Sequence, residues 1–277
     1  MSTTKNTDNA IPIEAWGTIL FEKFCRFRCV VTTGLSVHSD ELLGRRPYPA
    51  GAKVLDVGCG FGDTTRRIAQ QVGPEGAASG VDCAPNFVKA ATEETRESGL
   101  VNASFFVADV QIEDLHGPYD FVFARFGTMF FNAPIAAFRN MREALRSGGE
   151  LAMIVWRHRE DNPWVHEAEL SVTDIVPVVS HENTNAVHCG PGPFSMAGPD
   201  MVSDMLKIAA MTAFPSSVST PTSASDARSM PRSNSRWRSV QRGRSSGSRG
   251  RPVRSAKTTW SRRCERPSPI IFKPGVS

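Results

Sequence analysis

The stretch that decides the fold is VLDVGCGFGD, residues 54–63 of the 277-residue chain. Its apolar residues, Val54, Leu55 and Val57, are typical of a strand that is covered on both faces of a sheet. Three glycines then follow at alternate positions from 58 to 62, which allows a sharp turn and lets a ligand approach the backbone. The stretch predicts a buried strand that runs through a glycine turn into a helix, as in α/β proteins that hold nucleotide-like cofactors.

The glycine spacing and the flanking carboxylates narrow the choice of ligand. A dinucleotide fingerprint has its third glycine five positions after the first, but here that position is Asp63. Asp56 and Asp63 would also surround a pyrophosphate with negative charge, whereas a pyrophosphate needs bare N–H groups and the positive end of a helix dipole. We therefore expect a ligand with a positively charged end. A tight turn that binds no ligand is the alternative.

Apolar runs alternate with helical patterns after the glycine turn. Strands are expected at 53–57, 77–81, 103–108, 119–124 and 150–156, with helices at about 64–72, 84–98 and 134–147. This alternation predicts an α/β fold in three layers, a doubly wound Rossmann-like fold with a mainly parallel sheet. Further helices are expected at 16–31, 37–43 and 200–210.

Three aspartates stand at or near the carboxyl ends of the first three strands. Asp56, Asp82 and Asp109 should therefore meet at one edge of the sheet, where ligands of such folds bind. Asp82 lies where an acidic residue can accept both hydroxyls of a ribose. A helix N-cap is the alternative role for Asp82, and a solvated turn is the alternative for Asp109.

At these residues the chain resembles the class I S-adenosylmethionine-dependent methyltransferases, and within them the group of ubiquinone/menaquinone-biosynthesis C-methyltransferases. The resemblance covers about residues 15–211. Its matching segments are VLDVGCGFGDTT from Val54, GVDCAPNFVKAA from Gly80, FVADV from Phe106, YDFVFARF from Tyr119 and LRSGGEL from Leu145. It implies the Rossmann-like methyltransferase fold and S-adenosylmethionine as cofactor, with no metal required.

The resemblance also implies roles for eight cofactor-binding residues. The methionine moiety would contact Asp56, Gly58 and Gly60, and the ribose would contact Asp82 with Cys83 beside it. The adenine would contact Asp109 and Val110. Arg125 would line the reactive end of the cofactor. A cofactor with a sulfonium and an ammonium group, and no phosphate, suits carboxylates near the turn. In-line attack on its methyl group would depend mainly on positioning.

The catalytic residue stays open at this stage. Several polar residues after the fifth strand could act as a base, and each could equally be a surface residue: His158, Asp161, His166, His181 and His188. Large apolar residues in the same region could line an acceptor pocket or could simply pack: Trp156, Trp164, Phe194 and Met196.

Composition divides the chain into three parts: an N-terminal helical segment at 1–45, a cofactor-binding methyltransferase domain at 46–211 and a basic tail at 212–277. Residues 1–211 carry 18 Lys and Arg against 26 Asp and Glu, whereas residues 212–277 carry 14 against 2. The first ten residues are polar and no apolar run approaches the roughly 20 residues of a membrane span, so a cytoplasmic protein is expected. Cys25 and Cys29 stand one helical turn apart and could reach a common metal, but the lack of a matching second pair favours packing on a helix face.

The tail, with 16 serines and 12 arginines, allows three interpretations. It could contact RNA phosphates, it could be a disordered extension, or it could be translated out of frame. For residues 233–242 and 259–272 a neighbouring frame permits amphipathic helices, so we favour a frameshift near residues 211–216. On that hypothesis the C-terminal strands are lost and the tail is disordered. An uninterrupted reading frame at the sequenced locus would contradict it.

The sequence thus predicts methyl transfer from S-adenosylmethionine to a small acceptor, apolar or quinone-like. The alternatives are a cofactor-binding but inactive remnant of a methyltransferase and an RNA-associated methyltransferase that uses the tail. Nucleic acid is not the expected partner, and the oligomeric state is not indicated by the sequence.

Overall fold

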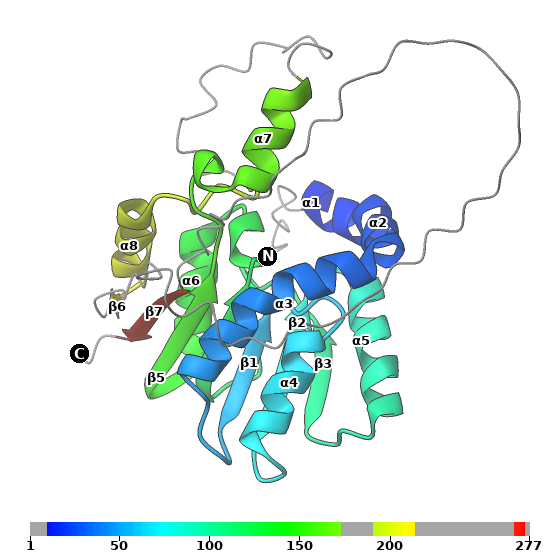
Figure 1. The fold of residues 1–277 in the computed structure, drawn as a ribbon. Coiled ribbons are helices and arrows are strands. Elements are labelled where there is room, and N and C mark those ends of the chain that lie inside the picture. The colour runs from blue at the N-terminus through cyan, green and yellow to red at the C-terminus, as the bar shows by residue number, and fades with distance from the viewer. Residues whose placement is uncertain (1–9, 173–190, 214–268, 275–277) are drawn as a thin grey trace, which may run out of the picture.

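The computed structural model describes residues 10–172, 191–213 and 269–274. They include one sheet of seven strands in the order β3-β2-β1-β4-β5-β7-β6, with helices on both faces (Figure 1). The first five strands are β1 Lys53–Val57, β2 Ala77–Asp82, β3 Ala103–Val107, β4 Tyr119–Arg125 and β5 Leu145–Ile154. Neighbours among these five pair in parallel. The predicted α/β fold with a mainly parallel sheet is confirmed.

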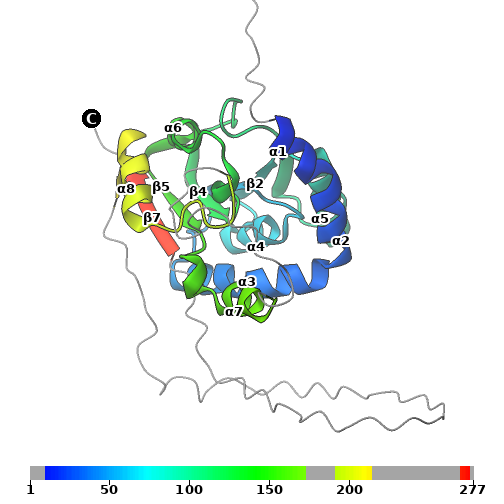
Figure 2. The ribbon, with the colours of Figure 1, turned by 90° about the horizontal axis from the view of Figure 1, so that it is seen from above.

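Helices connect the parallel strands and cover the sheet. The connecting helices are α4 Asp63–Val72, α5 Pro85–Ser98 and α6 Pro134–Ala144. The N-terminal helix α3, Arg28–Arg45, lies with α4 over one face of the sheet, and α6 lies with α8, Pro199–Ile208, over the other (Figure 2). A proline opens α5, α6 and α8, at the helix position where its missing N–H is not needed.

The core is centred on β1. Val54, Leu55 and Val57 have no exposed surface, and Phe123 of β4 and Phe138 of α6 are equally buried. Burying each such side chain contributes about 1.5–3 kcal/mol, so burial holds the strand that leads into the glycine turn firmly in place. The sequence reading of a strand covered on both faces is therefore correct.

The N-terminal region differs from the expected pair of helices. It forms α1 Ala10–Ala15, a π-helical turn η2 Trp16–Leu20, α2 Phe21–Arg26 and then α3. The helix breaks at Phe27, which leaves the helical region at φ −105° and ψ 16° and whose side chain is half exposed. The break lets residues 10–26, the N-terminal cap, bend over the carboxyl edge of the sheet while α3 runs along its face (Figure 1). The helix expected at 37–43 is the second half of α3.

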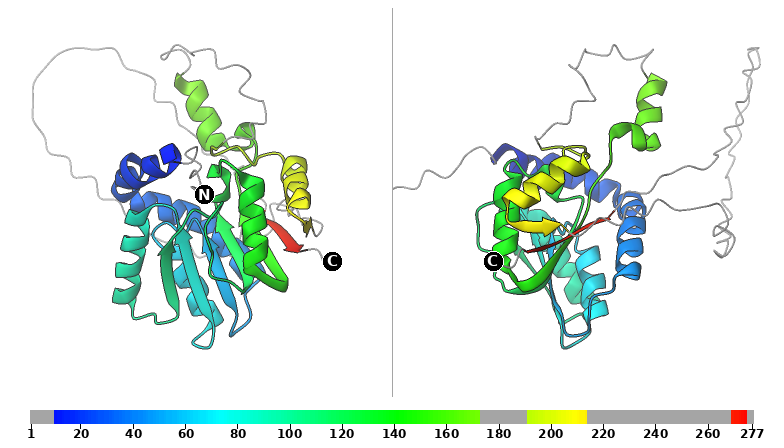
Figure 3. Two further views of the ribbon diagram at one scale, coloured as in Figure 1. Left: turned by 180° about the vertical axis from the view of Figure 1, so that it is seen from behind. Right: turned by 90° about the vertical axis from the view of Figure 1, so that its left-hand side faces the viewer.

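The C-terminal strands are present, contrary to the expectation that they are lost. β6, Met211–Ala213, and β7, Pro269–Pro274, extend the sheet beyond β5, and β7 is antiparallel to both of its neighbours (Figure 3). The reason is local: Ile270, Ile271 and Phe272 are the β-branched and aromatic residues that favour strands, even though the composition around them is basic. The expected strand at 150–156 also begins earlier, at Leu145.

The Ser- and Arg-rich segment 214–268, on which the RNA-binding, disorder and frameshift hypotheses depend, lies outside the described residues. Within the described ranges, every helix is too short or too polar to cross a bilayer.

Removal of residues 269–277 should destabilise the fold. Four residues of β5 and three of β6 lose their strand partner. At roughly 1 kcal/mol net for each hydrogen bond, the free energy of unfolding should fall by about 2–4 kcal/mol, and the freed edge of β5 should promote association. Denaturant unfolding and light scattering would measure both effects. A variant that lacks only residues 275–277 is the control, and equal stability of the two variants would show that β7 adds nothing.

Candidate functional site

The sheet order places the predicted site residues in a line along one edge. The carboxyl ends of the five parallel strands meet there, and their order is β3-β2-β1-β4-β5. Along this edge the line runs from Asp109 after β3, through Asp82 at the end of β2, Gly58 after β1 and Arg125 at the end of β4, to Trp156 after β5. All five line one cavity of about 840 Å³, a size that suits a small-molecule site.

The glycine turn forms the middle of the cavity floor. Gly58, Gly60 and Gly62 all have positive φ, at 70°, 52° and 72°, the region that glycine adopts without strain. The N–H groups of Gly58 and Cys59 donate to the Val81 carbonyl at 2.9 and 3.1 Å, which ties the turn to the end of β2. The turn opens α4 at Asp63, as the sequence predicts.

Two of these glycines are required by close packing as well as by their φ angles. A Cβ on Gly58 would lie 2.9 Å from the Cα of Gly127, in the turn after β4. A Cβ on Gly62 would lie 2.6 Å from the Phe105 ring, and that ring also leaves no space for a Cβ on Gly80. Phe105 therefore supports the turn from β3, a role that the sequence did not reveal.

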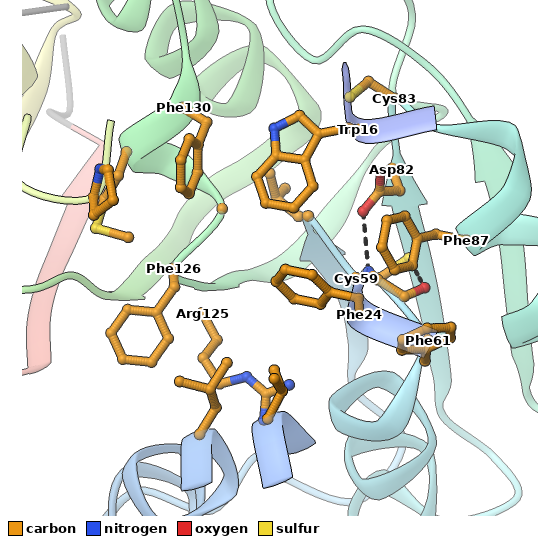
Figure 4. Close-up of a pocket in the computed structure, with 18 of the residues that line it drawn as sticks. Trp16, Phe24, Cys59, Phe61, Asp82, Cys83, Phe87, Arg125, Phe126 and Phe130 are labelled. Atoms are coloured by element: carbon orange, nitrogen blue, oxygen red, sulfur yellow. Dashed lines mark hydrogen bonds between the residues drawn. The ribbon is translucent and has the colours of Figure 1, made fainter. Parts of the chain in front are cut away.

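Asp82 supports the glycine turn and also faces the cavity. Its carboxylate accepts hydrogen bonds from the backbone N–H groups of Gly60 and Ala84, each at 3.0 Å, so it braces the glycine turn and the turn before α5. The N-cap of α5 is Ala84, without a side-chain cap bond, so the N-cap role considered for Asp82 is not found. Asp82 also lines the cavity, where it can accept further hydrogen bonds from a ligand (Figure 4). Burial raises the pKa of Asp82, and the backbone N–H bonds oppose that rise.

Asp109 and its neighbours form the far end of the cavity. The Asp109 carboxylate accepts the backbone and side-chain N–H groups of Gln111, each at 3.0 Å, which is the turn role considered above. Asp109, the buried Val110 and Cys83 all line the cavity. Burial raises the pKa of the Cys83 thiol to about 12, so the thiol is protonated at neutral pH.

Asp56 is the one of the eight proposed residues that lies outside the cavity lining. It is 2% exposed and accepts a hydrogen bond from the Thr65 hydroxyl of α4 at 2.6 Å. Burial raises its pKa to about 7, and the Thr65 bond and the charge of Arg125 oppose that rise. Asp56 therefore lies on the side of the glycine turn that faces away from the cavity.

Arg125 is held in place from two sides. One guanidinium nitrogen donates to Asp63 at 2.9 Å and the other to the Ser39 hydroxyl at 3.2 Å, and only 10% of the side chain is exposed. The ion pair joins the end of β4 to the first residue of α4. Arg125 thus brings a fixed positive charge to the cavity wall beside the glycine turn.

Beyond Arg125 the cavity wall is aromatic. The rings of Phe126 and Trp156 stack with centroids 4.2 Å apart, and the His38 ring of α3 stands edge-on to them at 5.6 and 5.4 Å. Phe126 has φ 60°, which costs a non-glycine residue about 1–3 kcal/mol, so this packing holds a strained turn in place. Figure 4 shows Phe126 on the side of the cavity opposite Asp82.

Of the residues considered as catalytic bases, the structure places one in the cavity lining and two outside it, and two lie outside the described residues. Asp161 lines the cavity but pairs with Arg157 at 3.0 Å. His158 is exposed, and His158 and His166 both lie outside the cavity lining. His181 and His188 lie outside the described residues.

His38 is a cavity residue that the sequence reading missed. The available signal was its position: it continues the apolar face of Val31, Leu35 and Leu42 at helical spacing. Of the apolar candidates, Trp156 lines the cavity and Met196 is buried in the core. Phe194 lies beneath the Arg159 guanidinium, and Trp164 falls in α7, Pro163–Val172.

The N-terminal cap covers the cavity with aromatic side chains. Trp16 packs against Phe130 and Phe24 with ring centroids 4.9 and 5.5 Å apart, and all three line the cavity. At the start of α3, Arg28 pairs with Glu94 of α5 and lies 4.1 Å over the Phe61 ring of the glycine turn. Among the described residues, no group of three or more His, Cys, Asp or Glu side chains is arranged to hold a metal.

Residues 49–211 match the model of a family described as a methyltransferase domain. Two relatives are each 32% identical to the chain: aklanonic acid methyltransferase of Streptomyces sp. (strain C5), over 37% of this chain and 47% of the relative, and ubiquinone/menaquinone biosynthesis C-methyltransferase of Shewanella sp. (strain W3-18-1), over 42% and 46%. The chain therefore spans about half the length of the curated relatives it matches. The putative methyltransferase solved with the Haloferax volcanii Trm112 activator has a TM-score of 0.50 at 17% identity, covering 73% of this chain and 77% of that one, and shows the same fold.

Gly58→Ala should cost more stability than Gly60→Ala. Both substitutions place alanine at a positive φ, but only the Cβ at 58 meets backbone, since nothing lies within 4 Å of a Cβ at 60. We expect G58A to lower the free energy of unfolding by about 1–3 kcal/mol more than G60A does. Urea unfolding of both variants would measure this. Equal losses would contradict the close approach of the two turns.

Asp56→Asn should stabilise the protein at neutral pH. The folded-state pKa of Asp56 is about 7, above the roughly 3.9 of an unfolded chain, so between these values the folded state keeps a proton that the unfolded state has lost. The wild-type free energy of unfolding should therefore fall as pH rises through this window, and D56N should gain at least about 1 kcal/mol on wild type.

Urea unfolding at about pH 4.5 and about pH 8 would measure this gain. Asp204→Asn on the exposed face of α8 is the control. If the difference in the free energy of unfolding between D56N and wild type stays constant with pH, burial does not raise the pKa of Asp56.

Proposed function

Because this chain belongs to the family of methyltransferase domains, we propose that it transfers the methyl group of S-adenosylmethionine to a small, planar, largely apolar acceptor of the quinone type. Membership of the S-adenosylmethionine-dependent methyltransferases, predicted from the motifs, is confirmed by the family match. The activity of the whole protein, its acceptor and its site residues are proposals. The observation that carries them is the ordered line of site residues within one cavity.

The cofactor would extend along this line from β3 to β4. Its adenine would lie by Asp109 and Val110, its ribose hydroxyls by Asp82 with Cys83 beside them, and its methionine end over Gly58 and Gly60. Asp56 would not contact the cofactor and would instead support the glycine turn, because its carboxylate is buried beneath that turn. Arg125 would stand at the reactive end, where the cofactor faces the aromatic wall.

The charges of the side chains that line the cavity favour this placement of the cofactor. Asp63, Asp82 and Asp109 line it, whereas Arg125 is the only positively charged residue among the described lining residues. A cationic sulfonium and an ammonium group are attracted by this arrangement, and a pyrophosphate would be repelled by it. The protein would then contribute mainly by holding acceptor and methyl group in line for transfer.

The acceptor would occupy the β4 and β5 end of the cavity. Its walls are the aromatic side chains of Phe126, Phe130 and Trp156, which suit a flat apolar molecule. The names of two relatives, one acting on aklanonic acid and one in ubiquinone and menaquinone biosynthesis, support an acceptor of this kind.

The domain boundary at residue 211 is supported by the extent of the family match, which ends at that residue just where the composition changes. Because the family match does not extend into the tail, we keep a second candidate function, that of a chain that binds the cofactor without turnover. RNA binding through the tail and a cytoplasmic location stay predictions.

Asp82→Asn should weaken binding of the product, S-adenosylhomocysteine, by roughly 10- to 100-fold, because a hydrogen bond to a charged group is worth about 1.5–3 kcal/mol. Calorimetry with the full chain would measure the dissociation constant. Asp114→Asn, at an exposed carboxylate outside the cavity lining, is the control and should bind as wild type does. Equal affinity of D82N and D114N would contradict the ribose role of Asp82.

Product mass after incubation with S-adenosylmethionine and a panel of quinols, naphthols and polyketide phenols tests the activity. A mass gain of one methyl group supports the enzyme. Cofactor binding with no product from the panel supports the inactive candidate. No binding heat at millimolar cofactor, from a folded sample, would overturn both.

A further inference from the structure

Asn162 brings a neutral amide to the acceptor end of the cavity. It lies after β5 and directly before α7, and it lines the cavity together with its neighbours Asp161 and Pro163 and with Trp156. β5 stands beside β4, on the opposite side of β1 from β2 and β3. Only 5% of Asn162 is exposed. A buried polar side chain therefore lies at the end of the cavity that we propose for the methyl acceptor.

The orientation of this amide is fixed by the backbone around it. Its nitrogen Nδ2 donates hydrogen bonds to the carbonyl oxygens of Arg157 at 3.2 Å and His158 at 2.8 Å. The reverse orientation would turn the oxygen Oδ1 toward these two carbonyl oxygens, and an oxygen cannot donate to them. Oδ1 therefore lies on the other side of the amide group, away from the two carbonyls.

The oxygen Oδ1 of Asn162 accepts no hydrogen bond within the part of the chain that the structure describes. An asparagine directly before a helix usually accepts from N–H groups of the first turn, but here Val165 and His166 donate to the backbone carbonyl of Asn162, at 3.0 and 3.1 Å. Oδ1 also keeps accessible surface, because it is not one of the fully buried side-chain atoms that lack a partner among the described residues. It is therefore open to a ligand.

The other amide among the described lining residues is used at both ends. Gln111 donates through Nε2 to the Asp109 carboxylate at 3.0 Å, and its Oε1 accepts the backbone N–H of Ala133 at 2.6 Å. Asn162 differs because its nitrogen is held and its oxygen is left for a partner. A largely buried acceptor without a partner is unfavourable, so a ligand hydroxyl that reaches this oxygen gains affinity over a ligand that lacks one.

We propose that Asn162 is an acceptor-binding residue that sets specificity, and that its Oδ1 accepts a hydrogen bond from a hydroxyl of a planar, largely apolar acceptor. The proposal rests on the proposed function and names a polar group that its acceptor carries. An amide oxygen accepts a hydrogen bond but does not take up the proton, so this hydroxyl stays protonated. It serves as a recognition group that fixes how the ring lies against the aromatic wall of Phe126 and Trp156.

The test measures the binding of two ligands of similar shape, 1-naphthol and 1-methylnaphthalene, to the full chain with S-adenosylhomocysteine present. Only the first ligand has a hydroxyl. Asn162→Ala removes Oδ1, whereas Asn162→Asp keeps an acceptor oxygen and loses the amide donors. Asn102→Ala is the matched control, because the Asn102 amide also donates to backbone carbonyls, those of Ala69 at 2.9 Å and Gly73 at 2.7 Å, but lies outside the cavity lining.

Wild-type protein and N102A should bind 1-naphthol more tightly than 1-methylnaphthalene, although 1-methylnaphthalene is the more apolar ligand. N162A should shift the ratio of the two dissociation constants by roughly 5- to 100-fold toward 1-methylnaphthalene, because the partner of the hydroxyl is gone. N162D should keep the ratio within about threefold of wild type. The ratio isolates the hydroxyl, since a general loss of stability in a variant affects both ligands alike.

Wild-type protein that binds 1-methylnaphthalene at least as tightly as 1-naphthol would overturn the proposal without any variant. An unchanged ratio in N162A would overturn it too, and equal shifts in N162A and N162D would overturn it by assigning the side chain to its bonds with the backbone. Wild-type protein that binds S-adenosylhomocysteine but neither naphthalene would overturn the hydroxyl contact together with the proposed acceptor class. Wild-type protein that does not bind S-adenosylhomocysteine would instead overturn the proposed function itself.

Discussion

The site depends on the close approach of two backbone turns. A Cβ on Gly58 would lie 2.9 Å from the Cα of Gly127, and a Cβ on Gly127 would lie 3.0 Å from the Val57 carbonyl oxygen. Because neither residue has a side chain, the ends of β1 and β4 meet backbone to backbone. The floor of the cavity is therefore made of peptide groups at this point, and the proposed cofactor and acceptor ends lie in one cavity.

Much of the fold and of the proposed cofactor end of the cavity could be derived from the sequence, because both follow from local patterns and a general rule of topology. Glycines after an apolar run specify a turn, and parallel strands bring their carboxyl ends to one edge. Asp82 and Asp109 were proposed by that reasoning, since each stands at or just past a strand end, whereas Arg125 was proposed from the family resemblance. Of their alternative structural roles, the turn role of Asp109 holds, whereas the N-cap of α5 is Ala84 and not Asp82.

The remaining features depend on contacts between residues far apart in the chain. His38 reaches the site because α3 crosses the ends of β4 and β5, and the periodicity of a helix does not say which strands it will meet. Phe105 supports the glycine turn from β3, and β7 inserts between β5 and β6 although more than fifty residues separate it from β6. The burial of Asp56 likewise depends on α4, through Thr65.

The left-handed backbone at Phe126 sets backbone strain against packing. Glycine would adopt its φ of 60° without strain and so relieve about 1–3 kcal/mol, but loss of a buried phenylalanine costs about 3–5 kcal/mol. The ring is also one half of the stacked wall against which an acceptor would lie. Selection for stability and selection for turnover would therefore both retain phenylalanine at this position.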